Sequence, residues 1–162
     1  MAEAADKEAA VRAAFLYRLA FFVDWSPLLA SPDQPLRFCL LEADAQPVAL
    51  PLREHTRSRK VGSHPVEVAE LGAGDPLDGC HLVYLAAPRE LDAAQARMRL
   101  IVADDAAMLD HGAHLALVAE TEASGERRLA FLSRHDRIRA CDLDLNARLL
   151  QLVRLEGKEP RP

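Results

Sequence analysis

The segment from Val11 to Pro27, VRAAFLYRLAFFVDWSP, constrains this chain most, because it is too apolar for a surface helix and too short for a membrane. A spanning helix needs about 20 mostly apolar residues, and Arg18 and Asp24 interrupt this run earlier. Pro27 disfavours a helical conformation at the residue before it and so ends the helix. The apolar positions recur at helical spacing and form one face: Val11, Phe15, Leu19, Phe22 and Val23, widened by Leu16 and Ala20. We therefore expect a helix that covers a sheet and is packed on two sides.

The length of 162 residues predicts one domain over 1–162, ordered from about residue 8 to 155, with tails at 1–7 and 157–162. The formal net charge of −5 provides no global attraction to nucleic acid or to anionic lipid, which argues against both as partners. The start, MAEAADKEAA, has neither the basic region nor the apolar stretch of a secretory signal. Composition by itself favours the cytoplasm.

Short apolar runs between turn residues predict strands at 36–41, 64–71, 80–86, 100–103, 113–120 and 128–132. Helices are expected at 47–56, 90–98, 106–112, 134–139 and 146–155. Strands and helices alternate up to about residue 112, and the turn at 122–126 predicts a hairpin. This order indicates a single α/β domain with a mostly parallel central sheet, flanking helices and an antiparallel edge hairpin.

Two polar pairs qualify as ligand sites but have simpler interpretations. Asp104 and Asp105 follow a predicted strand, and one of them is expected to cap the next helix, because no third acidic residue completes a metal site. His111 and His114 have no further ligands at zinc spacing, so we interpret them as turn or surface residues. No metal-binding residue is therefore predicted.

Catalytic motifs are also missing from the sequence. No serine lies in a G-x-S-x-G motif, and Cys39 and Cys80 fall inside apolar strands where thiols are usually inert. An enzyme is therefore disfavoured, with no catalytic residue predicted. The cations gather in two clusters, each of which fits a solvated face: Arg53, Arg57, Arg59 and Lys60, and Arg127, Arg128, Arg134, Arg137 and Arg139. An anion site is the alternative, with Arg134, Arg137 and Arg139 as its candidates.

Several segments, read in order, resemble the YfiR-like family from about residue 8 to 155. The opening helix that ends in VDWSP is the most specific of them, and the short extended piece followed by a Leu-rich helix, LDLNARLLQLVRL, is the second. The segments between them are RFCLLEAD, RKVGSHPVEVAEL, CHLVYLA and IVADDAAMLDHGAHLALV. The chain departs from the family pattern at Ser133–Arg134, Cys141–Asp142 and Asn146–Ala147, so family contacts near the last helix are not transferred.

The resemblance implies a periplasmic regulator that restrains a membrane-bound diguanylate cyclase through the periplasmic sensor region of that enzyme. It also implies export, dimerisation, no catalysis and no cofactor. In an exported protein, Cys39 and Cys80 on neighbouring strands can form a disulfide that closes a loop of about 40 residues, while Cys141 stays free. Two buried free thiols are the competing interpretation.

Three hypotheses follow. The first is a YfiR-type regulator of cyclic-di-GMP signalling whose partner surface includes Trp25, Leu28 and Leu29, because aromatic anchors beside proline often carry interface energy. Trp25 is equally suited to close the core. The second is a small-anion or nucleotide sensor without a cyclase partner, and the third is a cytoplasmic α/β hydrolase, which needs a nucleophile within reach of a base.

Overall fold

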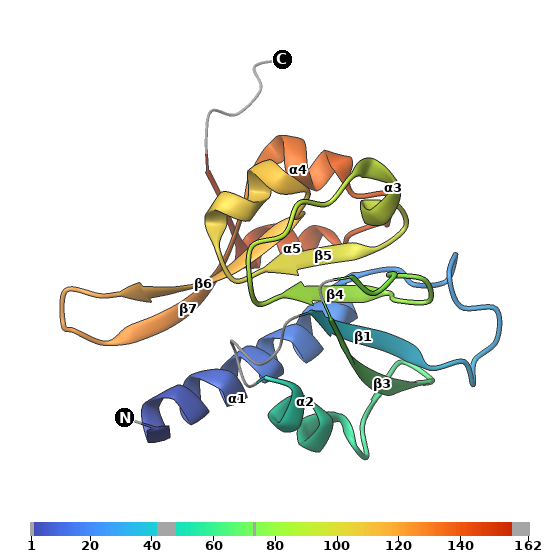
Figure 1. Ribbon diagram of the computed structural model, residues 1–162, viewed down its shortest axis with the longest axis horizontal. Coiled ribbons are helices and arrows are strands. Elements are labelled where there is room, and N and C mark those ends of the chain that lie inside the picture. The colour runs from blue at the N-terminus through green and yellow to red at the C-terminus, as the bar shows by residue number, and fades with distance from the viewer. Residues whose placement is uncertain (1, 42–47, 73, 157–162) are drawn as a thin grey trace.

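The computed structural model describes residues 2–41, 48–72 and 74–156, which form one mixed sheet flanked by helices (Figure 1). The strand order across the sheet is β2-β3-β1-β4-β5-β6-β7-β8. The strands are β1 (Leu36–Leu41), β2 (Lys60–Val61), β3 (His64–Leu71), β4 (Leu82–Leu85), β5 (Leu100–Ala103), β6 (Leu115–Thr121), β7 (Arg127–Ser133) and β8 (Val153–Leu155). The pairs from β3 to β6 are parallel, and β6 and β7 form an antiparallel hairpin. The predicted α/β class and mostly parallel sheet are confirmed.

The C-terminal segment differs from the prediction. The helix expected at 146–155 ends at Leu152, and β8 then pairs in parallel with β7, outside the hairpin. The hairpin therefore does not form the edge of the sheet along its whole length. Val153 is buried, Arg154 exposed and Leu155 half-buried, an alternation that a Leu-rich helical pattern concealed.

Helices cover both faces of the sheet. They are α1 (Ala2–Leu19), η1 (Ala20–Phe22), α2 (Ala49–Thr56), α3 (Ala93–Ala96), η3 (Ala106–His111), α4 (His135–Ala140) and α5 (Ala147–Leu152). α1 begins well before the predicted Val11, and a 3-10 turn ends it. In Figure 1, α1 and α2 lie on one side of the sheet, and η3 and α3 lie on the other. Pro47 and the predicted tail at 157–162 lie outside the described residues.

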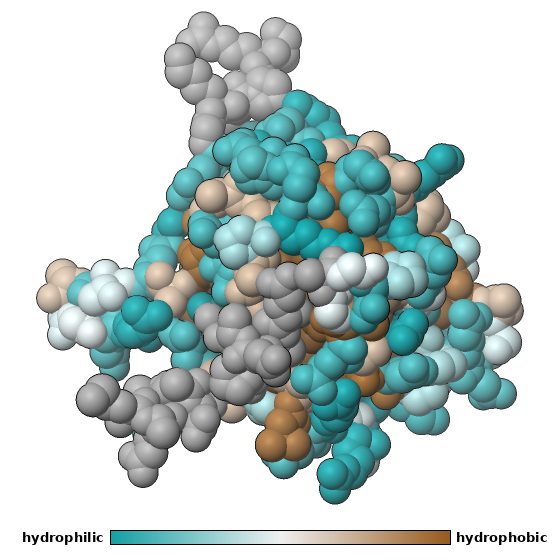
Figure 2. Space-filling view, viewed as in Figure 1, coloured by the Kyte–Doolittle hydropathy of each residue, from teal (hydrophilic) through white to brown (hydrophobic). Residues whose placement is uncertain are grey.

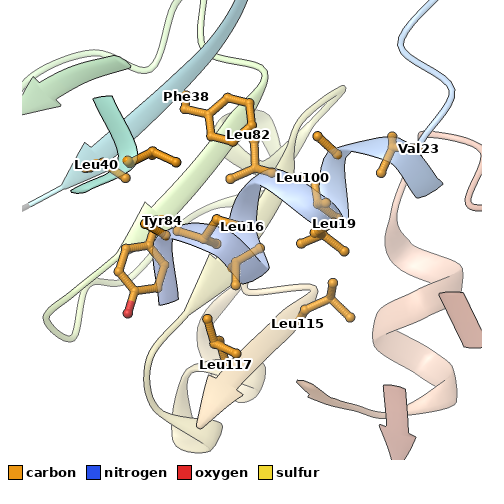
Figure 3. Close-up of a cluster of buried hydrophobic side chains, with 14 of the residues drawn as sticks. Leu16, Leu19, Val23, Phe38, Leu40, Leu82, Tyr84, Leu100, Leu115 and Leu117 are labelled. Atoms are coloured by element: carbon orange, nitrogen blue, oxygen red, sulfur yellow. The ribbon is translucent and has the colours of Figure 1, made fainter. Parts of the chain in front are cut away.

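The buried face of the first helix agrees with the prediction in its C-terminal part and differs before it. Leu16, Leu19, Ala20 and Val23 are buried as expected. Toward the N-terminus, Ala9 and Ala13 are buried in place of Val11, which is 43% exposed. Figure 3 shows Leu16 beside Tyr84 of β4, and Leu19 beside Leu100 of β5 and Leu115 of β6. Alanines let the helix backbone approach the sheet closely, so the larger Phe15 and Phe22 lie on its flank and are only half-buried.

A disulfide joins Cys39 of β1 to Cys80, just before β4, with the two Cα atoms 5.8 Å apart. Both residues are buried in the core of the sheet face opposite α1, and Cys141 is a free cysteine. The predicted bridge is confirmed, because β1 and β4 are neighbouring parallel strands.

Two short elements are shaped by local caps. α3 spans only Ala93–Ala96 instead of 90–98, since Asp92 and Gln95 form a capping box at its start and Met98 adopts a positive φ of 55° after it. The carboxylate of Asp105 accepts a hydrogen bond from the Ala107 N–H at 2.9 Å, which confirms the predicted cap.

Candidate partner-binding groove

An apolar groove lies between α1, β7 and α5. We call it the α1 groove and define it by its apolar lining: Val11, Phe15, Phe22, Leu129, Phe131, Leu149 and Leu152. The rings of Phe15 and Phe131 lie 5.7 Å apart at the floor of the groove. In Figure 1, the N-terminal half of α1 and the β6–β7 hairpin project from the sheet on the same side, and residues of both elements line this end of the groove.

Backbone hydrogen bonds hold α5 beside the end of α1. The Asn146 N–H donates to the Phe22 carbonyl at 2.7 Å, and the Asp24 N–H donates to the Asp144 carbonyl at 2.9 Å. The Asn146 side chain then caps α5 through the Arg148 N–H. These contacts place Leu149 and Leu152 against the groove.

Several apolar side chains of this region remain in solvent. Val11 is 43% exposed and Leu152 is 53% exposed, and Leu150 on α5 is also exposed. The face shown in Figure 2 is mostly hydrophilic, with hydrophobic atoms in small separate patches. A cluster of exposed apolar residues with a polar rim is typical of a protein interaction site.

The rim of the α1 groove is cationic although the whole chain carries a net charge of −5. Its basic residues are Lys7, Arg18, Arg127 and Arg128. Arg127 pairs with Glu8 at 2.9 Å and Arg128 pairs with Glu122 at 3.0 Å, whereas Lys7 and Arg18 are exposed without an ion pair among the described residues. Partly compensated cations around an apolar floor favour an acidic partner.

The predicted partner residues Trp25, Leu28 and Leu29 lie at a different place, which we call the Trp25 corner. Trp25 is only 5% exposed, and its Nε1–H donates to the Ala20 carbonyl at 2.9 Å. Leu29 is buried and Leu28 half-buried, and both of their N–H groups donate to the Trp25 carbonyl. The corner closes the core, so it offers little apolar surface; contact of these residues with a partner stays a prediction.

The three arginines proposed for anion binding have different surroundings. Arg134 pairs with Asp110 at 2.6 Å and with Asp136 at 3.2 Å, and the Nε–H of Arg137 donates to the Ala113 carbonyl at 2.9 Å. Arg139 is exposed. Carboxylates and a carbonyl thus already occupy two of the three guanidinium groups, and anion binding there stays a prediction.

A buried arginine that the sequence analysis did not single out links α1 to the sheet. Arg12 is 4% exposed and donates to the Tyr84 hydroxyl at 3.2 Å and to the Leu117 carbonyl at 2.8 Å. Desolvation raises the pKa of Tyr84 to about 12. It also raises the pKa of Asp104, near Arg12, to about 6. The only sequence signal was Glu8 one turn before Arg12 within an apolar helix, a spacing that predicts an ion pair.

Two of the histidines are structural hydrogen-bond acceptors. The Nδ1 atom of His114 accepts from the Ile101 N–H at 3.0 Å, and that of His81 accepts from the Arg37 N–H at 2.8 Å. Desolvation lowers the pKa of His114 to about 4 and also lowers that of His81. His114 lies in the bend just before β6, but its ring is buried, so the interpretation as a surface residue is wrong. His111 is exposed and pairs with Glu90.

Comparison with known proteins identifies the chain at the level of its family. None of the helices in the described ranges is long and apolar enough to cross a bilayer. A search of curated proteins finds no match. The family model described as YfiR/HmsC-like matches residues 9–154, which covers α1 from Ala9 onward, the Trp25 corner, the disulfide and the apolar lining of the α1 groove. The chain therefore belongs to the YfiR/HmsC-like family.

Proposed function

We propose that this chain is a periplasmic regulator that restrains a membrane diguanylate cyclase by binding the periplasmic sensor region of that enzyme through the α1 groove. Family membership supports the regulatory class, and a disulfide between Cys39 and Cys80 supports an oxidising compartment. The chain acts in this proposal by binding, without catalysis and without a cofactor.

The exposed apolar lining of the α1 groove is the observation that carries the proposal. Val11 and Leu152 are about half-exposed, yet they adjoin Phe15 and Phe131, which are continuous with the core. Burial of this lining by a partner gains about 25 cal/mol for each Å² of apolar surface removed from water. Exposure of this surface to water does not stabilise the isolated chain.

Restraint follows if the chain binds the inactive conformation of the cyclase more tightly than the active one. A ligand shifts a conformational equilibrium only by the difference between its affinities for the two states. The groove would therefore recognise a surface that the sensor region presents in its inactive conformation. Release of the chain would return the cyclase to its own equilibrium.

The test compares two exposed leucines. Leu152 lines the α1 groove, whereas Leu50 on α2 is 65% exposed and lies outside it. Leu152→Asp should weaken binding to the purified periplasmic sensor region of the cognate cyclase about tenfold or more, because it places a charge in an apolar contact. Leu50→Asp should leave the affinity unchanged. In membranes that contain the cyclase, Leu152→Asp should repress its activity less than the wild type does, and Leu50→Asp should repress it as well as the wild type does.

Other outcomes would redirect or contradict the proposal. If Leu28→Glu abolishes binding and Leu152→Asp does not, the partner docks at the Trp25 corner. If the wild-type chain shows no affinity for the sensor region, the proposed function is wrong. Dimerisation stays a prediction that sedimentation of the wild-type chain at several concentrations would settle.

A further inference from the structure

The outer edge of β7 is only partly paired among the described residues. β6 pairs with β7 from Arg127 to Leu132 on one side. On the other side β8 pairs only with Phe131, Leu132 and Ser133. The chain before β8 forms α5 instead of continuing the strand, so the first half of β7 has no strand neighbour on that side.

The hydrogen-bond pattern of the hairpin shows which backbone groups face this open edge. The Glu122 N–H donates to the Glu126 carbonyl at 2.8 Å, so Glu122 and Glu126 form a hydrogen-bonded pair. Bonded and non-bonded pairs alternate along an antiparallel ladder. The N–H and C=O groups of Arg127 and Leu129 therefore point away from β6. The Ser133 carbonyl, in the same phase, accepts from the Glu156 N–H beyond β8 at 2.8 Å, as this alternation requires.

The open edge borders the α1 groove. The side chain of Leu129 lines the groove and packs against the core on the α1 side of the sheet, together with Phe131. A strand that paired with this edge would direct every second side chain toward Phe15 and Val11. Backbone ladder bonds and an apolar floor are the two requirements for strand addition by an extended peptide.

The opposite edge of the sheet contrasts with this one. It is formed by β2, which has only two residues and pairs only with His64 and Pro65, and by the rest of β3, which carries the acidic residues Glu67 and Glu70. The open edge of β7 carries the cations Arg127 and Arg128 instead. Charges at an edge discourage pairing with apolar or basic strands but permit an acidic one.

We propose that the edge of β7 from Arg127 to Leu129 accepts an extended acidic segment of the protein partner, which adds a strand beside β7 and places apolar side chains in the α1 groove. Its acidic residues meet Lys7, Arg18, Arg127 and Arg128 on the rim. This inference rests on the proposed function, because it names the form in which the partner occupies the groove. A segment of a second copy is the competing occupant.

Proline substitution tests the backbone contact directly. Arg127→Pro removes an N–H that points away from β6, so the ladder between β6 and β7 is kept. Arg127→Ala is the matched control, because it removes the same side chain and the same ion pair with Glu8. Arg127→Pro should bind the purified periplasmic sensor region of the cyclase at least tenfold more weakly than Arg127→Ala. Equal affinities of the two variants would overturn strand addition.

Hydrogen exchange on the wild-type chain supplies a readout that does not depend on folding of the proline variant. Saturation with the sensor region should slow exchange of the Arg127 and Leu129 amides. The Arg128 and Ala130 amides already bond to β6 and serve as internal references. Strand addition is wrong if the sensor region binds, Leu152→Asp weakens that binding, and the Arg127 and Leu129 amides stay unprotected. Protection that rises with chain concentration alone would assign the edge to a second copy and overturn the proposal.

Discussion

The Trp25 corner follows the C-terminal end of α1, whereas the α1 groove runs along that helix, and the apolar residues of the two regions differ in their exposure to solvent. At the corner, Trp25 is buried and its only polar group is hydrogen-bonded. In the groove, Val11 and Leu152 stay in solvent beside half-buried phenylalanines. Trp25, two residues before Pro27, is thus part of the core, and the surface that fits a partner lies elsewhere.

The contrast teaches that the strength of an apolar signal in a sequence does not say whether the residue is used for stability or for binding. Substitutions at the corner should lower the free energy of unfolding of the isolated chain. Substitutions in the groove should change the free energy of unfolding little and should lower the affinity for the partner. The following predictions test this difference, from the largest effect to the smallest.

Truncation at the corner should have the largest effect on stability. Trp25→Ala removes a buried aromatic side chain and the hydrogen bond to the Ala20 carbonyl. We expect the free energy of unfolding to fall by about 3–5 kcal/mol, measured by chemical denaturation. A change below about 1 kcal/mol would mean that the corner is not part of the closed core.

Loss of the disulfide should follow closely. The bridge spans a sequence separation of 41, for which the chain-entropy estimate is roughly 3 to 4 kcal/mol. The double variant Cys39→Ser, Cys80→Ser should therefore unfold at much lower denaturant concentration than the oxidised wild type. Cys141→Ser is the control, because Cys141 is free and should matter far less. Comparable losses in both variants would contradict the assigned pairing.

The pH dependence should reveal two buried groups that oppose each other. His114 has a pKa lowered by desolvation to about 4, so the unfolded chain binds its proton first and stability falls as the pH drops from 6.5 to 4. Asp104 has a pKa raised by desolvation to about 6, so its contribution is greatest below pH 3.8 and is lost as the pH rises to 6. The wild type should therefore show a shallow profile between pH 4 and 6.

Replacement of Asp104 separates the two contributions. Asp104→Asn should raise the free energy of unfolding at pH 7 by about 1 kcal/mol, a figure reduced from the full shift because the carboxyl is only half-buried. It should also steepen the loss of stability on acidification, since His114 then acts unopposed. An unchanged slope between pH 6.5 and 4 would show that burial does not raise the pKa of Asp104.

The smallest effect on stability is expected in the groove. Leu152→Asp changes a half-exposed side chain near the end of α5, so the free energy of unfolding should stay within about 0.5 kcal/mol of the wild type. The same variant should lose affinity for the sensor region. A large loss of stability would make Leu152 part of the core and remove the contrast with Trp25.

Local sequence patterns predicted much of the fold. β-branched and leucine runs between turn residues located six of the eight strands, and alternation of strands with helices indicated the parallel order. The exceptions are instructive. Lys60–Val61 is too short to show a period, and Val153–Leu155 looked like the end of a helix, since a Leu-rich run satisfies both periods over three residues.

Fewer features of the candidate site could be predicted from the sequence. Ala13 faces the sheet and Val11 does not, because the small alanine side chain lets the helix approach the sheet closely. Whether β7 ends at a paired or an open edge depends on where α5 turns into β8, which is a property of the whole sheet. In the sequence, Arg12 resembles a solvent-exposed charge, and only the folded structure shows its hydrogen bonds to Tyr84 and Leu117.

The sequence by itself determined the α/β class, the cap at Asp105 and the family, because each depends on residue types at fixed local spacing or on their order along the chain. It also identified Cys39 and Cys80 as a possible pair. Only the tertiary structure decided that they bond, that Trp25 is closed into the core and that one edge of β7 stays open. Those outcomes depend on distances between segments far apart in the chain, which no local pattern encodes.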